Sequence, residues 1–344
     1  MPPLLEARNL RKIYHGGGLF ASAATETVAV EDFSMSVSDE TPSFVTVAGE
    51  SGSAKTTIAH LLLGLTAPTD GNIMYRGEDL RTLKGDGLRT FRKDVQAIFQ
   101  DPFEVYNPFY RIDRILTTPI RKFKLANSKT EALVLAAEAL ETVGLRPDET
   151  LGRYPHQLSG GQRQRITIAR ALLLKPRLII ADEPVSMVDA SLRATILESL
   201  HNLHSTFGIS LIYITHDLTT AYQITDTLVV LYRGTIAEAG PVEDVIRHPQ
   251  HPYTRELIGS IPAPDPARGW LDEEICGKEN GDDAGGGCRY AGRCAEVMQR
   301  CRSQMPALFQ TDARRTCACF LHEESPALEQ GHDLTRILAA RSTP

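Results

Sequence analysis

Cysteine is missing from most of this 344-residue chain, and none precedes Cys276. All six cysteines lie between Cys276 and Cys319, which requires a chemical explanation local to the last quarter of the chain. The sequence also lacks an apolar run of the roughly 18 to 20 residues that span a bilayer, and a basic segment followed by an apolar core at its start. These absences predict a protein that stays in the cytoplasm.

The chain also has no excess of positive charge. The net charge is −6, so no overall basic field attracts nucleic acid, and generic nucleic-acid binding is unsupported. Hydrophobic residues make up 42% of the chain, which at this length is enough to build more than one compact unit. We therefore expect a protein that folds unaided.

Strand and helix patterns alternate along the chain. Two strand-like segments, residues 4–14 and 27–37, predict a small antiparallel layer. Ser128 and Glu131 form a capping box that predicts a helix over residues 128–143. Buried-strand patterns lie at residues 44–48, 178–181, 209–215 and 227–232, with helical patterns between them. This alternation predicts an α/β fold with a mostly parallel sheet covered by helices.

A loop of small residues follows the strand at 44–48 and reads Gly-Glu-Ser-Gly-Ser-Ala-Lys-Thr-Thr. Such residues let backbone N–H groups close around phosphates, while Lys55 would neutralise the outer phosphates and Thr56 would place its hydroxyl on Mg²⁺. Contacts to a nucleoside triphosphate are therefore predicted for Gly49, Ser51, Gly52, Ser53, Ala54, Lys55, Thr56 and Thr57.

Ala54 stands where this loop pattern requires glycine. A methyl group there would crowd the loop or limit its dihedral freedom, although alanine is the smallest change possible. The alternative for the whole loop is an ordinary turn of small residues before a helix, which the preceding buried strand disfavours.

Two carboxylates and a histidine follow predicted strands. Asp182 and Glu183 come after the apolar run 178–181, and ligands in folds of this type bind beyond the carboxyl ends of parallel strands. Asp182 would hold Mg²⁺ through water, and Glu183 would polarise the attacking water. His216, which follows the strand at 209–215, would contact the γ-phosphate. Ordinary solvated or capped strand ends are the alternative.

The order of these motifs, together with Leu-Ser-Gly-Gly-Gln at 158–162, resembles the nucleotide-binding subunit of an ABC transporter from Leu4 to about His251. The resemblance implies an ABC-type nucleotide-binding domain over residues 1–250. It would contain a RecA-like parallel sheet core, an antiparallel β subdomain and an α-helical subdomain at about 101–165. Residues 251–344 would form a C-terminal extension that contains the cysteines.

The same resemblance implies roles for single residues. Tyr14 would stack on the adenine of ATP, with an ordinary strand-end aromatic as the alternative, and Gln100 would sense Mg²⁺ and the membrane partner. Asp189 would belong to a loop that communicates between subunits. The Mg²⁺ site would comprise Thr56, Gln100 and Asp182. The signature, which acts on the ATP of a partner subunit, would comprise Ser159, Gly160, Gly161 and Gln162.

Three strings resemble one branch of this family, the ATPases of Opp/Dpp-type oligopeptide and dipeptide importers. They are Gln100-Asp101-Pro102-Phe103, DEPVSMVDA at 182–190 and HPYTREL at 251–257. The branch implies ATP hydrolysis that energises peptide import, at the cytoplasmic face of the membrane. Its partners would be a second ATPase subunit, usually a different chain, two transmembrane permease subunits and an extracytoplasmic solute-binding protein.

Import of oligosaccharides or nickel by the same machinery is the alternative within this branch. A soluble ABC ATPase that acts on nucleic acid or ribosomes is a second alternative, from another class. Proteins of that class typically carry a long coiled-coil insertion or a second nucleotide domain, and this sequence has neither.

The cysteines agree with the same branch, whose C-terminal motif they resemble. The resemblance implies a [4Fe–4S] cluster, for which four thiolates are suitable ligands. Zinc is the alternative, although its ligands usually come in tighter pairs. Cys317 could replace Cys319 as a ligand, and Cys276 is predicted to be a free thiol. The predicted cluster ligands are Cys288, Cys294, Cys301 and Cys319.

Overall fold

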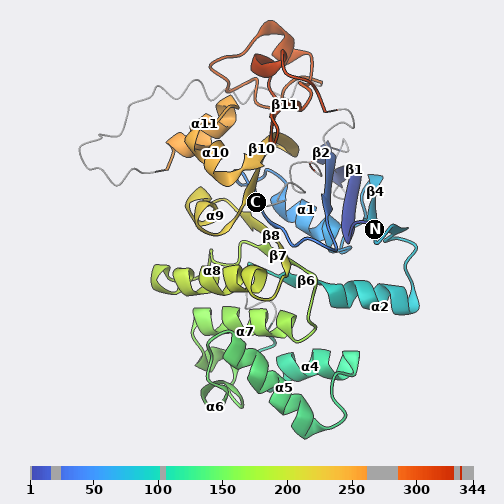
Figure 1. The fold of residues 1–344 in the computed structure, drawn as a ribbon, viewed down its shortest axis with the longest axis vertical. Coiled ribbons are helices and arrows are strands. Elements are labelled where there is room, and N and C mark those ends of the chain that lie inside the picture. Colours follow the sequence, from blue (N-terminus) through green and yellow to red (C-terminus); the bar gives the residue numbers. More distant parts are fainter. Residues whose placement is uncertain (1, 17–24, 101–105, 262–285, 329–333, 335–344) are drawn as a thin grey trace, which may run out of the picture. The chain divides into compact units, whose positions relative to one another are not determined.

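A computed structural model describes residues 2–16, 25–100, 106–261, 286–328 and 334 (Figure 1). Cys276 and the string Asp101-Pro102-Phe103 lie outside the described residues. The contacts divide the chain into two compact units. The first comprises Met1–Thr41, Val45–Arg81 and Thr215–Pro344, and the second comprises Pro42–Phe44 and Thr82–Ile214.

The first unit contains an antiparallel sheet. Its strands run in the order β2 (Thr25–Val37), β1 (Leu5–Gly16), β4 (Asp70–Tyr75) and β5 (Glu78–Asp79). The pairing of β1 with β2 confirms the predicted antiparallel layer. Strand β4 was not predicted because it begins with Asp-Gly-Asn, which are residues typical of turns.

A second sheet of this unit lies beside helices α1 (Lys55–Leu62), α9 (Leu218–Ile224), α10 (Val242–Arg247) and α11 (Pro252–Gly259). Its strands run in the order β11 (Phe309–Asp312), β12 (Arg315–Cys317), β10 (Thr235–Pro241), β9 (Thr227–Tyr232) and β3 (Phe44–Ala48). Strands β3 and β9 are parallel, while the pairs from β9 to β11 are antiparallel. The predicted sequence of strand, phosphate loop and helix is confirmed by β3 and α1.

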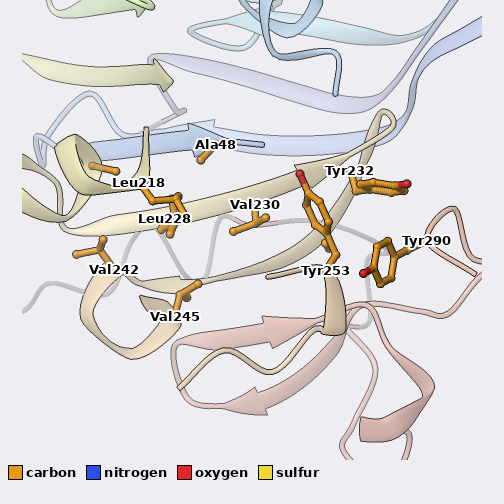
Figure 2. Packing of buried hydrophobic residues seen from close by; sticks show 11 residues of the cluster. Ala48, Leu218, Leu228, Val230, Tyr232, Val242, Val245, Tyr253 and Tyr290 are labelled. Carbon is orange, nitrogen blue, oxygen red and sulfur yellow. The ribbon is translucent and has the colours of Figure 1, made fainter. Parts of the chain in front are cut away.

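The core of the first unit includes a residue from the predicted C-terminal extension. Figure 2 shows side chains of β3, β9 and the helices α9, α10 and α11 packed together, and Tyr290 joins them beside Tyr232 and Tyr253. Tyr290 is only 4% exposed. The described part of the extension, which also contains the short 3₁₀ helices Gln299–Arg302 and Phe320–His322, therefore shares one core with the phosphate loop's unit.

A buried ion pair joins β12 to β10. Arg315 donates to the carboxylate of Glu238 at 2.6 Å, and Glu238 is completely buried. The same carboxylate accepts from the backbone N–H groups of Gln250 and His251 at 3.1 and 2.9 Å. Such a pair is tolerated in a core because hydrogen bonds satisfy its oxygens, whereas loss of one partner would be costly.

The second unit has three parallel strands and a helical region. Strand β7 (Leu178–Asp182) pairs in parallel with β8 (Ser210–Thr215), as predicted, and also with β6 (Val95–Ile98), which was not predicted. The helices are α2 (Gly85–Asp94), α4 (Asp113–Phe123), α5 (Lys129–Thr142), α6 (Pro147–Thr150), α7 (Gly160–Leu172) and α8 (Ala190–Ser205), with a 3₁₀ turn at Pro155–Gln157. No helix in the described ranges is long and apolar enough to cross a membrane.

Helix α5 begins as predicted, with one difference in its capping. The hydroxyl of Ser128 accepts from the N–H of Glu131 at 3.1 Å. The carboxylate of Glu131, however, accepts from the N–H of Asn127 at 2.7 Å and not from Ser128. The Glu131 side chain thus bonds one residue before the N-cap, at Asn127, and the capping box is displaced by one residue.

Candidate functional site

The phosphate loop, residues 49–57, joins β3 to α1. A Cβ atom at Gly49 would lie 2.2 Å from the carbonyl oxygen of Leu231, so the close approach of β9 requires glycine there. Lys55 is 6% exposed, and its Nζ donates to the carbonyl oxygens of Gly49 and Glu50 at 2.8 and 3.0 Å. The ammonium group thus lies against the loop backbone at the start of α1, a position suited to an anion-binding loop.

Ala54 adopts the left-handed conformation, with φ 75° and ψ 13°. For a residue with a Cβ atom this conformation costs about 1 to 2 kcal/mol relative to the right-handed one. The methyl group of Ala54 therefore does oppose the backbone conformation of the loop, as expected from the sequence. The remaining loop residues differ in access: Ser51, Gly52 and Thr56 are exposed, Thr57 is half-buried, and Ser53 is buried.

His216 and Tyr14 belong to the same unit as the phosphate loop. His216 follows β8 directly and is exposed. Asp217 then caps α9, since its carboxylate accepts from the N–H of Thr219 at 2.9 Å. Tyr14 lies near the end of β1, 42% exposed, with the Nζ of Lys12 at 5.1 Å from its ring centroid. An exposed ring of this kind is available for stacking.

Asp182 and Glu183 belong to the second unit. Asp182 is the last residue of β7, 6% exposed, and pairs with Ile214 of β8. Glu183 has a φ angle of 45°, and its N–H donates to the carbonyl oxygen of Ile214 at 2.9 Å. Its own carbonyl oxygen accepts from the hydroxyl of Ser186 at 3.0 Å. The left-handed backbone turns the chain sharply at the carboxylate pair, as is common at functional positions.

The signature opens α7 in the second unit. Ser159 caps the helix: its hydroxyl accepts from the N–H of Gln162 at 3.2 Å, and its own N–H donates to the side chain of Gln162 at 2.9 Å. At Gly161 a Cβ atom would lie 2.6 Å from a methyl group of Leu192 on α8. The glycine therefore allows α7 to approach α8, in addition to presenting backbone N–H groups.

Gln100 and Asp189 are both exposed residues of the second unit. Gln100 comes shortly after β6, where the preceding carbonyl, that of Phe99, accepts from the buried side chain of Gln164 at 3.4 Å. Asp189 precedes α8, and its carbonyl oxygen accepts from the N–H of Leu192 at 2.9 Å. The structure thus gathers Asp182, Glu183, Gln100, Asp189 and the signature in one unit, and the phosphate loop, Tyr14 and His216 in the other.

The thiols of the C-terminal extension influence one another. Burial, with smaller contributions from the neighbouring thiols of Cys319, Cys288 and Cys301, raises the pKa of Cys294 to about 11. Cys317 lies in strand β12 and is completely buried, and of the other cysteines only Cys319 contributes to its raised pKa. In the part of the chain that the structure describes, no three His, Cys, Asp or Glu side chains gather closely enough to hold a metal ion. The four thiols are therefore near neighbours that do not form a closed ligand set.

Sequence reasoning missed two residues that contact the phosphate loop from far along the chain, Arg293 and Tyr253. Glu50, in the loop itself, accepts a forked ion pair from Arg293 at 2.9 and 3.1 Å. The N–H of Glu50 donates to the hydroxyl of Tyr253 at 2.9 Å. Tyr253 lies in the HPYTREL string, which was used only to recognise the branch, and no local pattern points from Arg293 to residue 50.

Comparisons with known proteins agree with this geometry. The family model of ABC transporters matches residues 30–186, and that of the oligopeptide/dipeptide transporter C-terminal region matches residues 237–301. A probable peptide ABC transporter ATP-binding protein of Sinorhizobium fredii is 40% identical over 343 residues, which are 99% of this chain and 95% of the relative. The oligopeptide transport ATP-binding protein OppF of Escherichia coli is 39% identical over 79% of this chain and 82% of its own length.

Solved structures show the same fold. A dimeric ATP-binding cassette in a post-hydrolysis state, bound to ADP and phosphate, is 27% identical to this chain, with a TM-score of 0.59. The match extends over 69% of this chain and 98% of the cassette. The predicted ABC-type α/β fold is thus confirmed, and this chain belongs to the family of ATP-binding proteins of oligopeptide and dipeptide ABC transporters.

Proposed function

We propose that this chain is the ATP-hydrolysing subunit of a transporter that imports oligopeptides or dipeptides across the cytoplasmic membrane. The observation that carries the proposal is the phosphate loop, whose glycines and Lys55 have the conformation of an anion site, in a chain that matches the peptide-transporter family over nearly its whole length. The relatives are named for peptide or oligopeptide transport, which favours peptides over oligosaccharides or nickel.

The site residues divide the work. The loop N–H groups and Lys55 would bind the phosphates, and Tyr14 would stack on the adenine. Thr56, Gln100 and Asp182 would hold Mg²⁺, whose charge would offset that of the phosphates. Glu183 would orient and polarise the attacking water, and His216 would contact the γ-phosphate.

A second ATPase subunit is part of this proposal. In this superfamily the signature faces the phosphate loop of the opposite subunit, so Ser159 to Gln162 would act on the partner's ATP and Asp189 would lie at the contact. The partner would be a different chain, and both would dock on two permease subunits at the cytoplasmic face of the membrane. A solute-binding protein on the other side would deliver the peptide.

The test is Glu183→Gln in the assembled transporter. ATP binding should be retained while hydrolysis falls at least about a hundredfold, because the water loses its base. Uptake of a labelled oligopeptide should fall with it. Glu198→Gln, on the exposed side of α8, is the matched control and should behave as the native chain. Uptake of nickel or of an oligosaccharide in place of the peptide would contradict the substrate class.

We further propose that Cys288, Cys294, Cys301 and Cys319 hold a [4Fe–4S] cluster that stabilises the extension. The spacing of these four cysteines resembles the C-terminal motif of the branch, and Cys319 fits better than Cys317, which is fixed in β12. The thiols would close around the cluster when it binds, because no closed ligand set exists among the described residues. Iron and acid-labile sulfide in anaerobically purified protein should disappear in Cys294→Ser and remain in Cys317→Ser. Zinc without iron would contradict the cluster.

A further inference from the structure

Glu50 of the phosphate loop is held at three points. Its carbonyl oxygen accepts from Lys55 at 3.0 Å, its N–H donates to Tyr253 at 2.9 Å, and its carboxylate accepts both guanidinium branches of Arg293. A forked pair of this kind fixes direction as well as distance. Glu50 is therefore one point at which distant parts of the chain contact the loop.

Arg293 comes from the C-terminal extension, where it stands next to Cys294. We call residues 288–294 the cysteine segment. Besides Glu50, Arg293 pairs with Glu256 on α11, and these two carboxylates raise the pKa of Arg293 despite its partial burial. Because it bridges two carboxylates, Arg293 ties the cysteine segment to the phosphate loop and to α11 at once.

Buried aromatic rings pack beside this bridge. Tyr253 is completely buried, and its ring centroid lies 4.5 Å from that of Tyr232 and 5.6 Å from that of Tyr290 (Figure 2). Burial raises the pKa of Tyr253 to about 12, so its hydroxyl stays protonated and its oxygen accepts from Glu50. Tyr290 itself belongs to the cysteine segment, which thus contributes both a packing ring and the cation.

A second ion pair anchors the segment on the same unit. Arg289 pairs with Glu31 of β2. The N–H of Glu31 donates to the carbonyl oxygen of Gly234, and the N–H of Gly234 donates to that of Ser53 in the phosphate loop. The cysteine segment is thereby connected to the phosphate loop at Glu50 and, through Glu31 and Gly234, at Ser53.

We propose that Arg293 is a positioning residue for nucleotide binding: the cysteine segment holds the phosphate loop in its binding shape through the Arg293 to Glu50 pair. The loop binds phosphates through N–H groups whose directions follow from its backbone, so fixing Glu50 in advance reduces the entropy lost on binding. The proposal rests on nucleotide binding by this loop and extends it, because affinity then depends on a segment outside the ABC motifs.

The test measures the affinity of the full-length chain for a fluorescent ATP analogue. Arg293→Ala should weaken binding about three- to tenfold, as expected for a half-exposed forked pair. The control is Arg300→Ala, which removes a comparable surface pair with Glu323 in the same extension. Both variants should lose similar thermal stability, so that the difference in affinity is specific to Arg293. Arg293→Lys should recover part of the affinity.

Glu50→Gln should weaken binding like Arg293→Ala, and the double variant should be no weaker than either single one. If Arg293→Ala fails to fold, Glu50→Gln removes the same ion pair and still tests the proposal. Binding by Arg293→Ala and Glu50→Gln equal to that of Arg300→Ala would overturn the proposal. If Lys55→Ala nevertheless loses binding, nucleotide binding itself stands; if the native chain binds no better than Lys55→Ala, both proposals fail.

Discussion

The helix starts of α1 and α7, which both follow or contain glycines, are built differently. No side chain caps α1, whose N-cap residue Ala54 sits in a left-handed conformation with its methyl group. Helix α7 is closed by its own residues, because Ser159 and Gln162 bond to each other's backbone. The uncapped start of α1 leaves its backbone N–H groups open to an anionic ligand, whereas the start of α7 already has its N–H groups bonded by Ser159 and Gln162. The difference agrees with the proposal that the start of α1 binds the chain's own ATP and that the start of α7 faces a partner.

The largest effect should come from the cation of the uncapped start. Lys55→Ala should weaken binding of an ATP analogue by about a hundredfold, because charge-assisted bonds to phosphate are lost in a partly buried site. Lys93→Ala, at the exposed end of α2, is the control and should bind as the native chain. Equal affinity of the two variants would mean that the loop does not bind phosphates through Lys55.

The stability of the protein should depend on pH through His251, which caps α11. Burial, with smaller effects from His322 and Arg255, lowers the pKa of His251 to about 4, and its Nδ1 accepts from the N–H of Tyr253 at the start of α11. The unfolded chain takes up this proton near pH 6.5, so the stability contributed by neutral His251 is complete above that value. It should fall by about 2 to 3 kcal/mol as the pH drops from 6.5 to 4.

Chemical denaturation between pH 6.5 and 4 measures how the free energy of unfolding changes with pH. His251→Asn keeps an acceptor at the cap and removes the titrating group, so its stability should depend less on pH. The comparison between the two proteins cancels the titration of other groups. Identical slopes would show that His251 does not carry the effect.

The capped start should show a smaller effect on activity and none on the chain's own affinity. Ser159→Ala should cost about 1 kcal/mol of stability and lower the ATPase rate of the assembled transporter about tenfold, since the partner's ATP loses a contact. Ser128→Ala removes an equivalent cap from α5 and should cost similar stability with an unchanged rate. Weaker ATP binding by the isolated Ser159→Ala chain would place the signature on its own site.

The smallest effect should follow relief of strain. Ala54→Gly should raise stability by up to about 1 kcal/mol and the ATPase rate severalfold, because the left-handed backbone no longer opposes a Cβ atom. The reverse change, Gly52→Ala, places a methyl group at φ 84° with no heavy atom within 4 Å and should lower both. An unchanged rate in Ala54→Gly would show that Ala54 does not slow hydrolysis.

The parts of this molecule that the sequence predicts are those determined by local patterns. The strand, loop and helix around Lys55, the parallel strands ending near Asp182 and the helix start at Ser128 all follow from spacing within a few residues. The left-handed turn at Glu183 and the forked pair between Glu50 and Arg293 depend on tertiary packing. No periodicity or cap relates residues 243 positions apart, so this contact required the structure.

The buried carboxylate of Glu238 should also delay the completion of folding during synthesis. Its guanidinium partner, Arg315, is translated 77 residues later. Until Arg315 has left the ribosome, burying Glu238 would place an unpaired charge in the core, at a cost of several kcal/mol. Strand β10 and the helix start at His251, which share that carboxylate, should therefore settle only after Arg315 has been translated. A nascent chain thus carries a complete phosphate-loop sequence long before it has a finished nucleotide site.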